Sequence, residues 1–372
     1  MMRVLLILLL ILTACSPPPQ GSPTARFNLD VSSALGGENT QGFLRAEQAR
    51  DFRFPEDHGL HPGYRNEWWY LTGNLHNEDG RRFGYQATFF STALSGETLN
   101  SSGWQSPRIW MAHVALTDVE AQTHIALERF ARENPGLAGA QISPFKVWLE
   151  NWSLRSADSR GEFFPWTLEI NDEAFSLDLR LEPLKSPVLQ GDAGLSQKSP
   201  QAGNASYYYS LTRLPSSGTL QIGEASYTVS GESWLDREWS TSALAADQSG
   251  WDWFSLQFDD GQELMYYRLR DQDGNAHPNS DGNWTDQEAQ QRRILPGEIE
   301  LEELASWRAP NGVDYTTEWQ LGYAGQRWLI RALLKDQFMD LSVAYWEGAV
   351  EILHPETGAR LGQGYLEMVR KP

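Results

Sequence analysis

Apolar and polar residues alternate with a period of two along much of this chain. Between residues 175 and 181 the apolar positions are Phe175, Leu177, Leu179 and Leu181, with polar residues between them. Successive side chains of a strand point to opposite faces, so this alternation predicts a strand with one buried face. Similar segments, rich in aromatic and β-branched residues, predict strands at 67–72, 82–91, 109–117, 145–154, 163–170, 207–211, 219–222, 226–229, from 250 onward, 264–269, 299–307, 315–321, 327–333, 341–346 and 364–368.

These predicted strands are short, and Gly, Asp and Asn turns separate them without a long amphipathic helix. The pattern indicates an all-β, antiparallel sandwich or barrel. More than a dozen strands are too many for one small barrel, so we expect two consecutive barrels, at 51–225 and 226–372. The pattern Asp-Gly-x-x-apolar-x-Tyr occurs after an aromatic strand at both Asp79 and Asp260. Two related barrels would explain this repeat, and chance in a Trp-rich chain would explain it almost as well.

The N-terminal residues are typical of a signal sequence. Arg3 precedes an apolar run at 4–12 that is too short to span a bilayer. The block Leu-Thr-Ala-Cys at 12–15 resembles the bacterial lipoprotein signal, in which the cysteine is acylated and becomes the mature N-terminus. We therefore expect a signal peptide at 1–14, lipidation of Cys15, a flexible tether at 15–50, and a place in the cell envelope on the periplasmic face of the outer membrane. An ordinary secretory signal with an incidental cysteine is the alternative.

The formal net charge is −19, or −20 once Arg3 leaves with the signal. This charge argues against nucleic acid and anionic lipid surfaces as partners, so we expect membrane contact through the lipid anchor only. A single cysteine excludes an internal disulfide. The 16 Trp, 13 Tyr and 15 Phe residues would fill cores, line cavities for apolar ligands, or stack on sugars.

Two carboxylates, Asp236 and Glu238, lie two residues apart in a predicted strand, so both should point to one face. We expect a site where residues 234–270 pack against the strand at 67–75. Glu238 would donate a proton, Asp236 would orient it or act as a base, and Tyr266 would be a second hydrogen-bond donor. The expected ligand-binding residues are Trp68, Trp69, Trp234, Arg237, Trp239, Trp251 and Trp253, with Arg237 paired to a carboxylate. Alternatively, the acids are exposed or merely tie the two barrels together.

Other catalytic patterns do not occur in the sequence. We find no His-Glu-x-x-His, cysteine cluster, Gly-x-Ser-x-Gly or phosphate loop. His58 and His61 lie near two acids, but a structural role is the simpler interpretation, and His113 fits a hydrogen-bonded core position. We therefore expect neither a metal nor a cofactor.

Six ordered blocks carry a resemblance to a known family. They are HP at 61–62 with EWWYLTGNL at 67–75, MAH at 111–113, NASYYY at 204–209, WLDREWS at 234–240, GWDW at 250–253 and YWEGAV at 345–350. Across residues 52–368 the chain resembles the AttH-like lipoproteins with lipocalin-like domains, which are related to carotenoid 1,2-hydratase (hydroxyneurosporene synthase). The resemblance implies two consecutive lipocalin-like β-barrels and a hydrophobic ligand. It also implies a link to an ABC-type export permease.

The hydratase branch of this family adds water to an isoprenoid double bond without a cofactor. Its Asp-His-x-Trp block falls on residues 236–239, where Arg237 replaces the His. Arginine stays protonated in proteins and cannot exchange a proton as histidine does. A Tyr-Asp pair of the hydratases falls near Tyr266 and Tyr267, where the acid is missing. Glu238 would serve as the acid if burial raises its pKa.

Three function classes follow from the sequence. The first is a membrane-anchored, lipocalin-like protein that binds a hydrophobic isoprenoid or lipid ligand, which explains the anchor, the barrels and the aromatic residues without intact hydratase residues. The second is a carotenoid 1,2-hydratase-like lyase. The third is a carbohydrate-binding protein or glycosidase, which would also use tryptophans and paired carboxylates.

Overall fold

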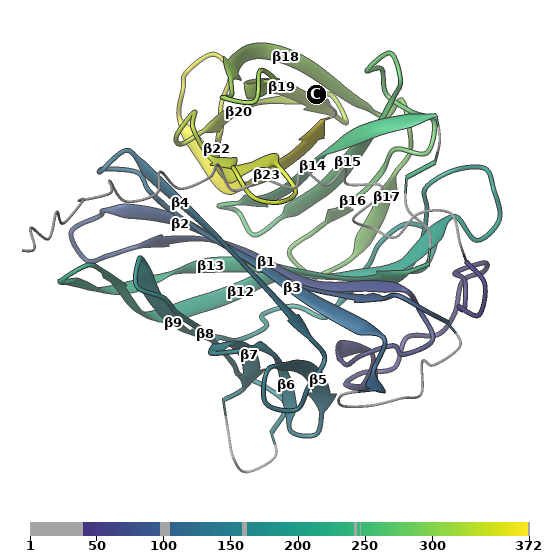
Figure 1. Cartoon of the computed structure of the whole chain (residues 1–372). Coiled ribbons are helices and arrows are strands. Elements are labelled where there is room, and N and C mark those ends of the chain that lie inside the picture. The colour runs from purple at the N-terminus through teal and green to yellow at the C-terminus, as the bar shows by residue number, and fades with distance from the viewer. Residues whose placement is uncertain (1–39, 97–104, 158–161, 242–243, 246, 371–372) are drawn as a thin grey trace, which may run out of the picture.

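The computed structural model describes residues 40–96, 105–157, 162–241, 244–245 and 247–370. This part of the chain is almost entirely antiparallel β, apart from the 3-10 turn η1 (Glu56–His58). The strands form two consecutive sheets, one a nearly closed barrel and the other a half-barrel, packed against each other (Figure 1). The predicted all-β fold with two consecutive antiparallel units is confirmed.

The first sheet has the strand order β4-β3-β2-β1-β13-β12-β9-β8-β7-β6-β5, and β10 and β11 also pair with β12. Its strands are β1 (Asn66–His76), β2 (Arg82–Ala93), β3 (Arg108–Asp118), β4 (Thr123–Arg132), β5 (Ala138–Ile142), β6 (Phe145–Leu149), β7 (Trp152–Ser156), β8 (Trp166–Asn171), β9 (Phe175–Leu181), β10 (Val188–Leu189), β11 (Leu195–Gln197), β12 (Ala205–Ile222) and β13 (Ala225–Ser240). At its centre β1 pairs with β13, and Tyr70 lies opposite Asp236.

The second sheet has the order β17-β16-β15-β14-β23-β22-β20-β19-β18, and β21 pairs with β22. Its strands are β14 (Gln248–Phe258), β15 (Glu263–Asp271), β16 (Asp281–Thr285), β17 (Gln291–Ile294), β18 (Ile299–Arg308), β19 (Asp314–Tyr323), β20 (Gln326–Ala332), β21 (Phe338–Met339), β22 (Tyr345–Leu353) and β23 (Arg360–Arg370). The C-terminal strand β23 therefore lies in the interior of the sheet, between β14 and β22.

Two expected boundaries differ from the structure. β13, which we assigned to the second unit at 226–372, belongs to the first sheet, so the change of sheet falls between Ser240 and Gln248. The reason is the tight turn at 223–224, because a hairpin keeps β12 and β13 side by side. The expected tether at 15–50 also ends earlier, since Ala46 is fully buried in the first core and the Leu44 N–H donates to the Gly63 carbonyl at 2.9 Å. Residues 1–39, including the signal and Cys15, lie outside the described residues.

The central strands of the first sheet are buried on both faces. Along β13, Leu235 and Trp239 lie in the core of the first sheet, whereas Trp234 lies between the two sheets. β9, at a distance from the second sheet, instead alternates between buried and exposed residues. The second sheet has its own core around Trp319 and Trp346. The aromatic residues thus fill two cores and a third layer between the sheets.

Polar contacts fix the two sheets to each other. Gln257 of β14 donates to the carbonyls of Thr212 and Ser233 at 2.8 and 3.1 Å. The Arg213 Nε lies 2.6 Å from a carboxylate oxygen of Glu263, which is fully buried. Removing one partner of such a buried ion pair lowers the stability of the fold by several kcal/mol. The pair therefore favours the observed docking of one sheet on the other.

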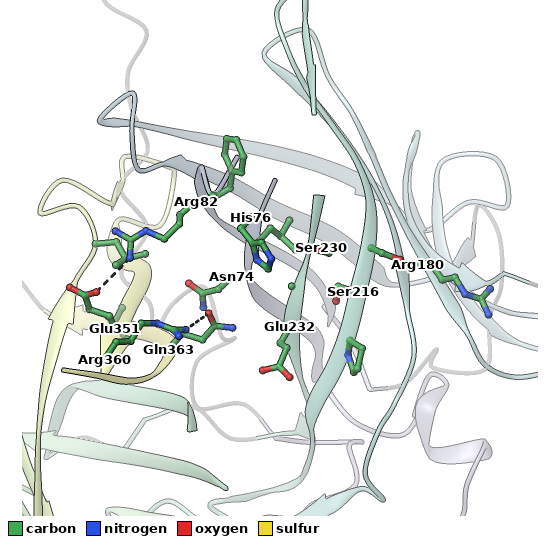
Figure 2. A pocket seen from close by; sticks show the side chains of 18 of the residues that line it. Asn74, His76, Arg82, Arg180, Ser216, Ser230, Glu232, Glu351, Arg360 and Gln363 are labelled. Atoms are coloured by element: carbon green, nitrogen blue, oxygen red, sulfur yellow. Dashed lines mark hydrogen bonds and ion pairs between the residues drawn. The ribbon is translucent and has the colours of Figure 1, made fainter. Parts of the chain in front are cut away.

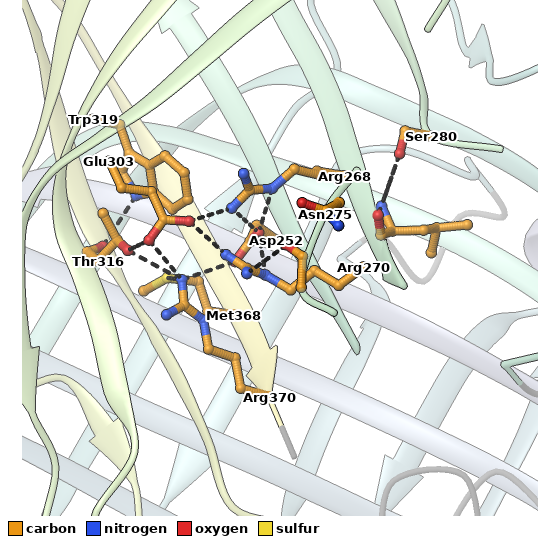
Figure 3. A network of polar contacts seen from close by, with 12 residues as sticks. Asp252, Arg268, Arg270, Asn275, Ser280, Glu303, Thr316, Trp319, Met368 and Arg370 are labelled. Carbon is orange, nitrogen blue, oxygen red and sulfur yellow. Dashed lines mark hydrogen bonds and ion pairs between the residues drawn. The ribbon is translucent and has the colours of Figure 1, made fainter. Parts of the chain in front are cut away.

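An arginine cluster lies within the second sheet (Figure 3). The buried carboxylate of Asp252 pairs with Arg268 and Arg270 at 2.8 Å each and with Arg370 at 3.4 Å. Glu303 of β18 contacts the same three arginines at 2.7 to 3.7 Å. Asp252 and the three arginines lie on the neighbouring strands β15, β14 and β23, and Glu303 lies on β18 at the other end of the sheet, so the cluster connects β18 to strands that are not its neighbours. We found no helix among the described residues that has the length and apolar character needed to cross a membrane.

Candidate functional site

A cavity of about 190 Å³ lies between the two sheets. Residues of β1, β2, β3, β12 and β13 line it from the first sheet, and residues of β14, β15, β22 and β23 line it from the second. Its aromatic lining consists of Trp68, Tyr70, Phe90, Tyr208, Trp251, Trp253, Tyr267 and Tyr345. Carboxyl groups and one lysine lie among these rings, so the cavity is apolar with a few polar groups, as small-molecule sites usually are.

Asp236 is the most enclosed acid of the first-sheet wall, with 3% of its surface exposed. It accepts hydrogen bonds from Trp234 Nε1 at 2.6 Å, Ser210 Oγ at 2.5 Å and the Tyr208 hydroxyl. Burial raises the pKa of Asp236 to about 7, against the opposing effect of these three donors. Trp253 Nε1 donates to the Tyr208 hydroxyl at 3.1 Å, which links this group to the second sheet. A carboxyl with this pKa can hold or release a proton near neutral pH.

Glu238 lies on the same wall and is bound as an acceptor. The Ser206 hydroxyl donates to its Oε1, and Lys198 Nζ lies 3.2 Å from the same oxygen. Lys198 also donates to Ser196 Oγ at 2.9 Å and lies 4.3 Å from the ring centre of Tyr267. Burial opposes the charge of Lys198, but Glu238 and Tyr267 outweigh it and raise the lysine pKa. This end of the cavity therefore holds a paired positive and negative charge.

Glu367 of β23 faces the cavity from the opposite wall. Its Oε1 accepts a hydrogen bond from Trp251 Nε1 at 2.6 Å. Burial raises the pKa of Glu367 to about 7, the hydrogen bond from Trp251 opposes this rise, and the charge of Asp236 adds to it. Two carboxyl groups from different sheets thus have pKa values near neutrality, and the charge of Asp236 acts on Glu367 across the cavity.

The structure brings five of the predicted site residues to this cavity, namely Trp68, Asp236, Glu238, Trp251 and Trp253. Trp234 lies beside it, buried between the sheets and bound to Asp236. The spacing of two between the acids does place both on one face, as the alternation of a strand requires.

Four other predicted residues point away from the cavity. Trp69, Arg237 and Trp239 face the core of the first sheet, and Tyr266 faces the core of the second. The reason is again alternation, because each is the immediate neighbour of a residue that faces the cavity. Tyr267 lines the cavity where we expected Tyr266.

Arg237 stabilises the first sheet and does not line the cavity. Its guanidinium pairs with Glu67 and lies 3.7 Å from the ring centre of Trp69. Burial opposes ionisation of Glu67, but Arg237 and His61 lower its pKa to about 2. His61 contacts Glu67 at 3.0 Å and Asp57 at 3.1 Å. The carboxylate partner expected for Arg237 is therefore Glu67, a residue of the core.

Sequence reasoning missed several cavity residues, among them Tyr70, Lys198, Tyr208 and Glu367. Tyr70 follows Trp68 by two residues, so strand alternation alone could have found it. Glu367 lies opposite Trp253 in the register of β14 with β23, and these strands are far apart in sequence. No local pattern marks that pairing, so only the fold reveals it.

A second hollow of about 790 Å³ opens elsewhere at the junction of the sheets (Figure 2). Charged residues of both signs line it, and Arg82 pairs with Glu351 at 3.5 Å. Phe83 is the one Phe, Tyr or Trp among its described lining residues. This groove lacks the aromatic walls and the buried acids of the inter-sheet cavity.

In the part of the chain that the structure describes, no three His, Cys, Asp or Glu residues are grouped so that they could hold a metal ion.

Comparison with known proteins identifies the family of this chain. The model of the AttH-like family matches residues 45–370, which is most of the chain. The chain belongs to the AttH-like family. A crystal structure of an AttH candidate from Nitrosomonas europaea is 32% identical to this AttH-like chain, with a TM-score of 0.77, and the match covers 86% of this chain and 97% of that one.

Two further crystal structures share the fold of this AttH-like protein at low identity. Kievitone hydratase from Nectria haematococca is 13% identical, with a TM-score of 0.64, and 89% of this chain and 98% of that chain are covered. CghA, solved with Sch210972, is 12% identical, with a TM-score of 0.51 and coverage of 89% and 97%. These two likenesses concern the fold alone. No curated protein matches the chain.

Proposed function

We propose that this AttH-like protein binds a small hydrophobic molecule, of isoprenoid or lipid type, in the cavity between its two sheets. The observation that carries the proposal is the cavity itself, where Trp68, Phe90, Trp251 and Trp253 form apolar walls around a few polar groups. Burial of apolar ligand surface against such rings supplies binding energy, and Lys198, Glu238 and Asp236 supply orientation for a hydroxyl or carbonyl group.

Filling the cavity tests this proposal. We expect an organic extract of the purified full-length protein to contain an apolar small molecule, and farnesol to quench tryptophan fluorescence saturably. Thr92→Trp and Met111→Trp place a large ring at the cavity lining and should abolish both signals. Thr123→Trp, at an exposed position of β4, is the matched control and should keep them. Retention of an oligosaccharide, or signals unchanged in both cavity variants, would overturn the proposal.

A second function, hydration of a carbon–carbon double bond in that ligand, is favoured by the two carboxyls with near-neutral pKa. In this scheme Glu367 gives its proton to one alkene carbon, and the π electron pair forms the new C–H bond. Water adds to the resulting cation, which the aromatic faces stabilise, and Asp236 takes the proton that the water loses. Glu238, our expected proton donor, accepts from Ser206 and Lys198, so the donor role passes to Glu367. A protein of this fold that is named a hydratase agrees with this chemistry.

Isotope incorporation tests the hydration. Farnesol incubated with the protein in H₂¹⁸O should gain one ¹⁸O-labelled water, seen by mass spectrometry. Glu367→Gln and Asp236→Asn should each reduce the labelling at least a hundredfold, in keeping with loss of a general acid or base. Glu356→Gln, in an exposed turn, should not. Binding without label would leave the binding function standing alone.

The cellular setting is part of the proposal. The sequence around Cys15 supports a lipid anchor on the periplasmic face of the outer membrane. Family membership supports a link to an ABC-type exporter, which would deliver or remove the hydrophobic ligand. Membrane contact is then through the anchor, and the negative charge keeps the folded part away from anionic lipid.

A further inference from the structure

Two carboxyls of the inter-sheet cavity have no cationic partner. Asp236 lines the cavity from β13, and Glu367 lines it from β23 on the opposite wall. Asp236 accepts hydrogen bonds from two hydroxyls and an indole, and Glu367 accepts one from the indole of Trp251, so these donors are all neutral. In the described part of the chain, no lysine, arginine or histidine forms an ion pair with either carboxyl. Carboxylates enclosed in a protein are normally paired, so a positive charge is missing from these walls.

The cations that line the cavity already have acids of their own. Lys198 is the one Lys or Arg among the described lining residues, and its Nζ lies 3.2 Å from Oε1 of Glu238. His113 also lines the cavity, and its Nε2 lies 3.0 Å from Glu128 Oε2. The second oxygen of Glu238, Oε2, makes no hydrogen bond within the residues that the structure describes, although Glu238 is only 7% exposed. The lining therefore offers more acceptors of positive charge than it has cations to fill them.

Aromatic rings surround these carboxyls with a surface that attracts cations. The indole N–H of Trp251 is bound to Glu367 at 2.6 Å, and that of Trp253 is bound to the Tyr208 hydroxyl at 3.1 Å. The ring centre of Tyr70 lies 5.1 Å from that of Trp253, in an edge-to-face contact. Because groups of the wall bind the polar edges of both indoles, the remaining ring surface is left for a ligand. The electron-rich face of an aromatic ring attracts a cation, and aromatic enclosures of this kind recognise quaternary ammonium groups.

We propose that the ligand of this cavity is a hydrophobic ammonium compound, an isoprenoid or lipid amine whose positive charge lies between Asp236 and Glu367. The inference rests on the binding function proposed above and names the charge of its ligand. In that position the ammonium group supplies the counter-ion that neither sheet provides. A neutral alcohol would leave both carboxyls without a counter-ion. A ligand carboxylate would be repelled by them, since Lys198 is already paired.

The apolar part of the first-sheet wall gives the direction of the hydrocarbon tail. Trp68 on β1 lies opposite Phe90 on β2, and Phe90 lies opposite Met111 on β3. All three line the cavity, and they lead away from β13, which carries Asp236. None of the three is charged, so a tail that extends along them is buried against rings and a thioether. The charged group and the tail thus find matching surfaces in one cavity.

A matched pair of ligands tests the charge. Farnesyltrimethylammonium and its neutral isostere, in which a quaternary carbon replaces the nitrogen, have the same shape and differ in charge. Fluorescence titration of the full-length protein at about pH 8, above the pKa of both carboxyls, should show that the ammonium compound binds about tenfold more tightly or better. Equal affinity, or tighter binding of the isostere, would overturn the inference while the proposed binding of a hydrophobic ligand stands. Failure of both compounds to bind would overturn the binding function and this inference with it.

The position of the charge is tested with variants of the two carboxyls. Glu367→Gln and Asp236→Asn keep the side-chain shape and remove the charge, and each should lower the preference for the ammonium compound about tenfold. Glu356→Gln, in an exposed turn, should keep the preference of the native protein. Because the preference compares two ligands of one shape on the same variant, partial unfolding or a change of cavity shape affects both affinities alike. A preference that is unchanged in both carboxyl variants would overturn the proposal.

Discussion

Buried carboxyl groups in this protein differ in their proton affinity because their partners differ. Glu67 lies beside the permanent charge of Arg237, and its pKa falls to about 2 although it is buried. Asp236 is as deeply buried, but its partners Ser210, Tyr208 and Trp234 are neutral, and its pKa rises to about 7. Neutral donors stabilise a carboxylate less than a guanidinium does, so desolvation prevails at Asp236. The same kind of group therefore serves the core in one place and lines the cavity in the other.

This difference predicts the pH dependence of Asp236→Asn. Folded Asp236 binds its proton more tightly than the unfolded chain does, so its contribution to stability is complete below the unfolded pKa of 3.8 and is lost as the pH rises through about 7. Asparagine does not titrate. As the pH rises across this window, the free energy of unfolding of the native protein should therefore fall relative to that of Asp236→Asn, by at most about 4 kcal/mol. Chemical denaturation at pH 4 and pH 7 measures the shift.

The control for this prediction is Glu356→Gln, because Glu356 is exposed and should contribute no comparable pH dependence. A variant whose stability relative to the native protein stays constant between pH 4 and pH 7 would show that folding does not raise the pKa of Asp236.

At the scale of the strand, alternation decides which residue faces the cavity. Residues 233–240 of β13 and most of β15 are buried on both faces, so apolar character does not distinguish the core side from the cavity side. On such strands a choice between neighbours such as Tyr266 and Tyr267 depends on the register with distant strands. We did not predict β4 from the sequence. Its residues are mostly half-buried, and its sequence lacks the clean alternation of apolar and polar residues that marks a strand with one buried face.

The two neighbouring tyrosines of β15 therefore give a matched test. Tyr267→Phe removes a hydroxyl that lies 2.8 Å from Ser196 Oγ at the cavity, and should weaken farnesol binding about threefold to tenfold, in line with a hydrogen bond of about 1 kcal/mol. Tyr266→Phe alters the core of the second sheet and should leave the affinity unchanged. Fluorescence titration of both variants measures the difference, and an equal loss in the two would contradict our assignment of the faces.

At the scale of the whole molecule, the cavity exists because two sheets share a face. β1, β12 and β13 supply one wall and β14, β22 and β23 the other, so neither sheet alone forms the site. Inter-sheet contacts such as Asn74 Nδ2 to the Gly364 carbonyl, at 3.0 Å, hold the two walls in place. The N-terminal signal would connect this assembly to a membrane through a tether.

Replacing the anchor cysteine tests that connection. Cys15→Ser removes the acylation site, so we expect the protein to move from the membrane fraction to the soluble fraction, because two or more acyl chains are what stable anchoring requires. Ser16→Asp is the matched change beside it, and we expect that variant to stay with membranes but to shift from the outer to the inner membrane. Cys15→Ser protein that is still wholly membrane-bound would contradict the anchor.

The sequence by itself determined the all-β class, the two consecutive units, and the shared face of Asp236 and Glu238, because period-two alternation and turn residues act locally. It also predicted a site where the stretch 234–270 packs against the strand at 67–75, because these two blocks hold most of the paired acids and aromatic residues. Only the tertiary structure decided that Trp69, Trp239 and Tyr266 face the cores, and that Lys198, Tyr208 and Glu367 join the cavity. The physical reason is that strand pairing and the docking of one sheet on the other depend on contacts between distant residues, which no local pattern records.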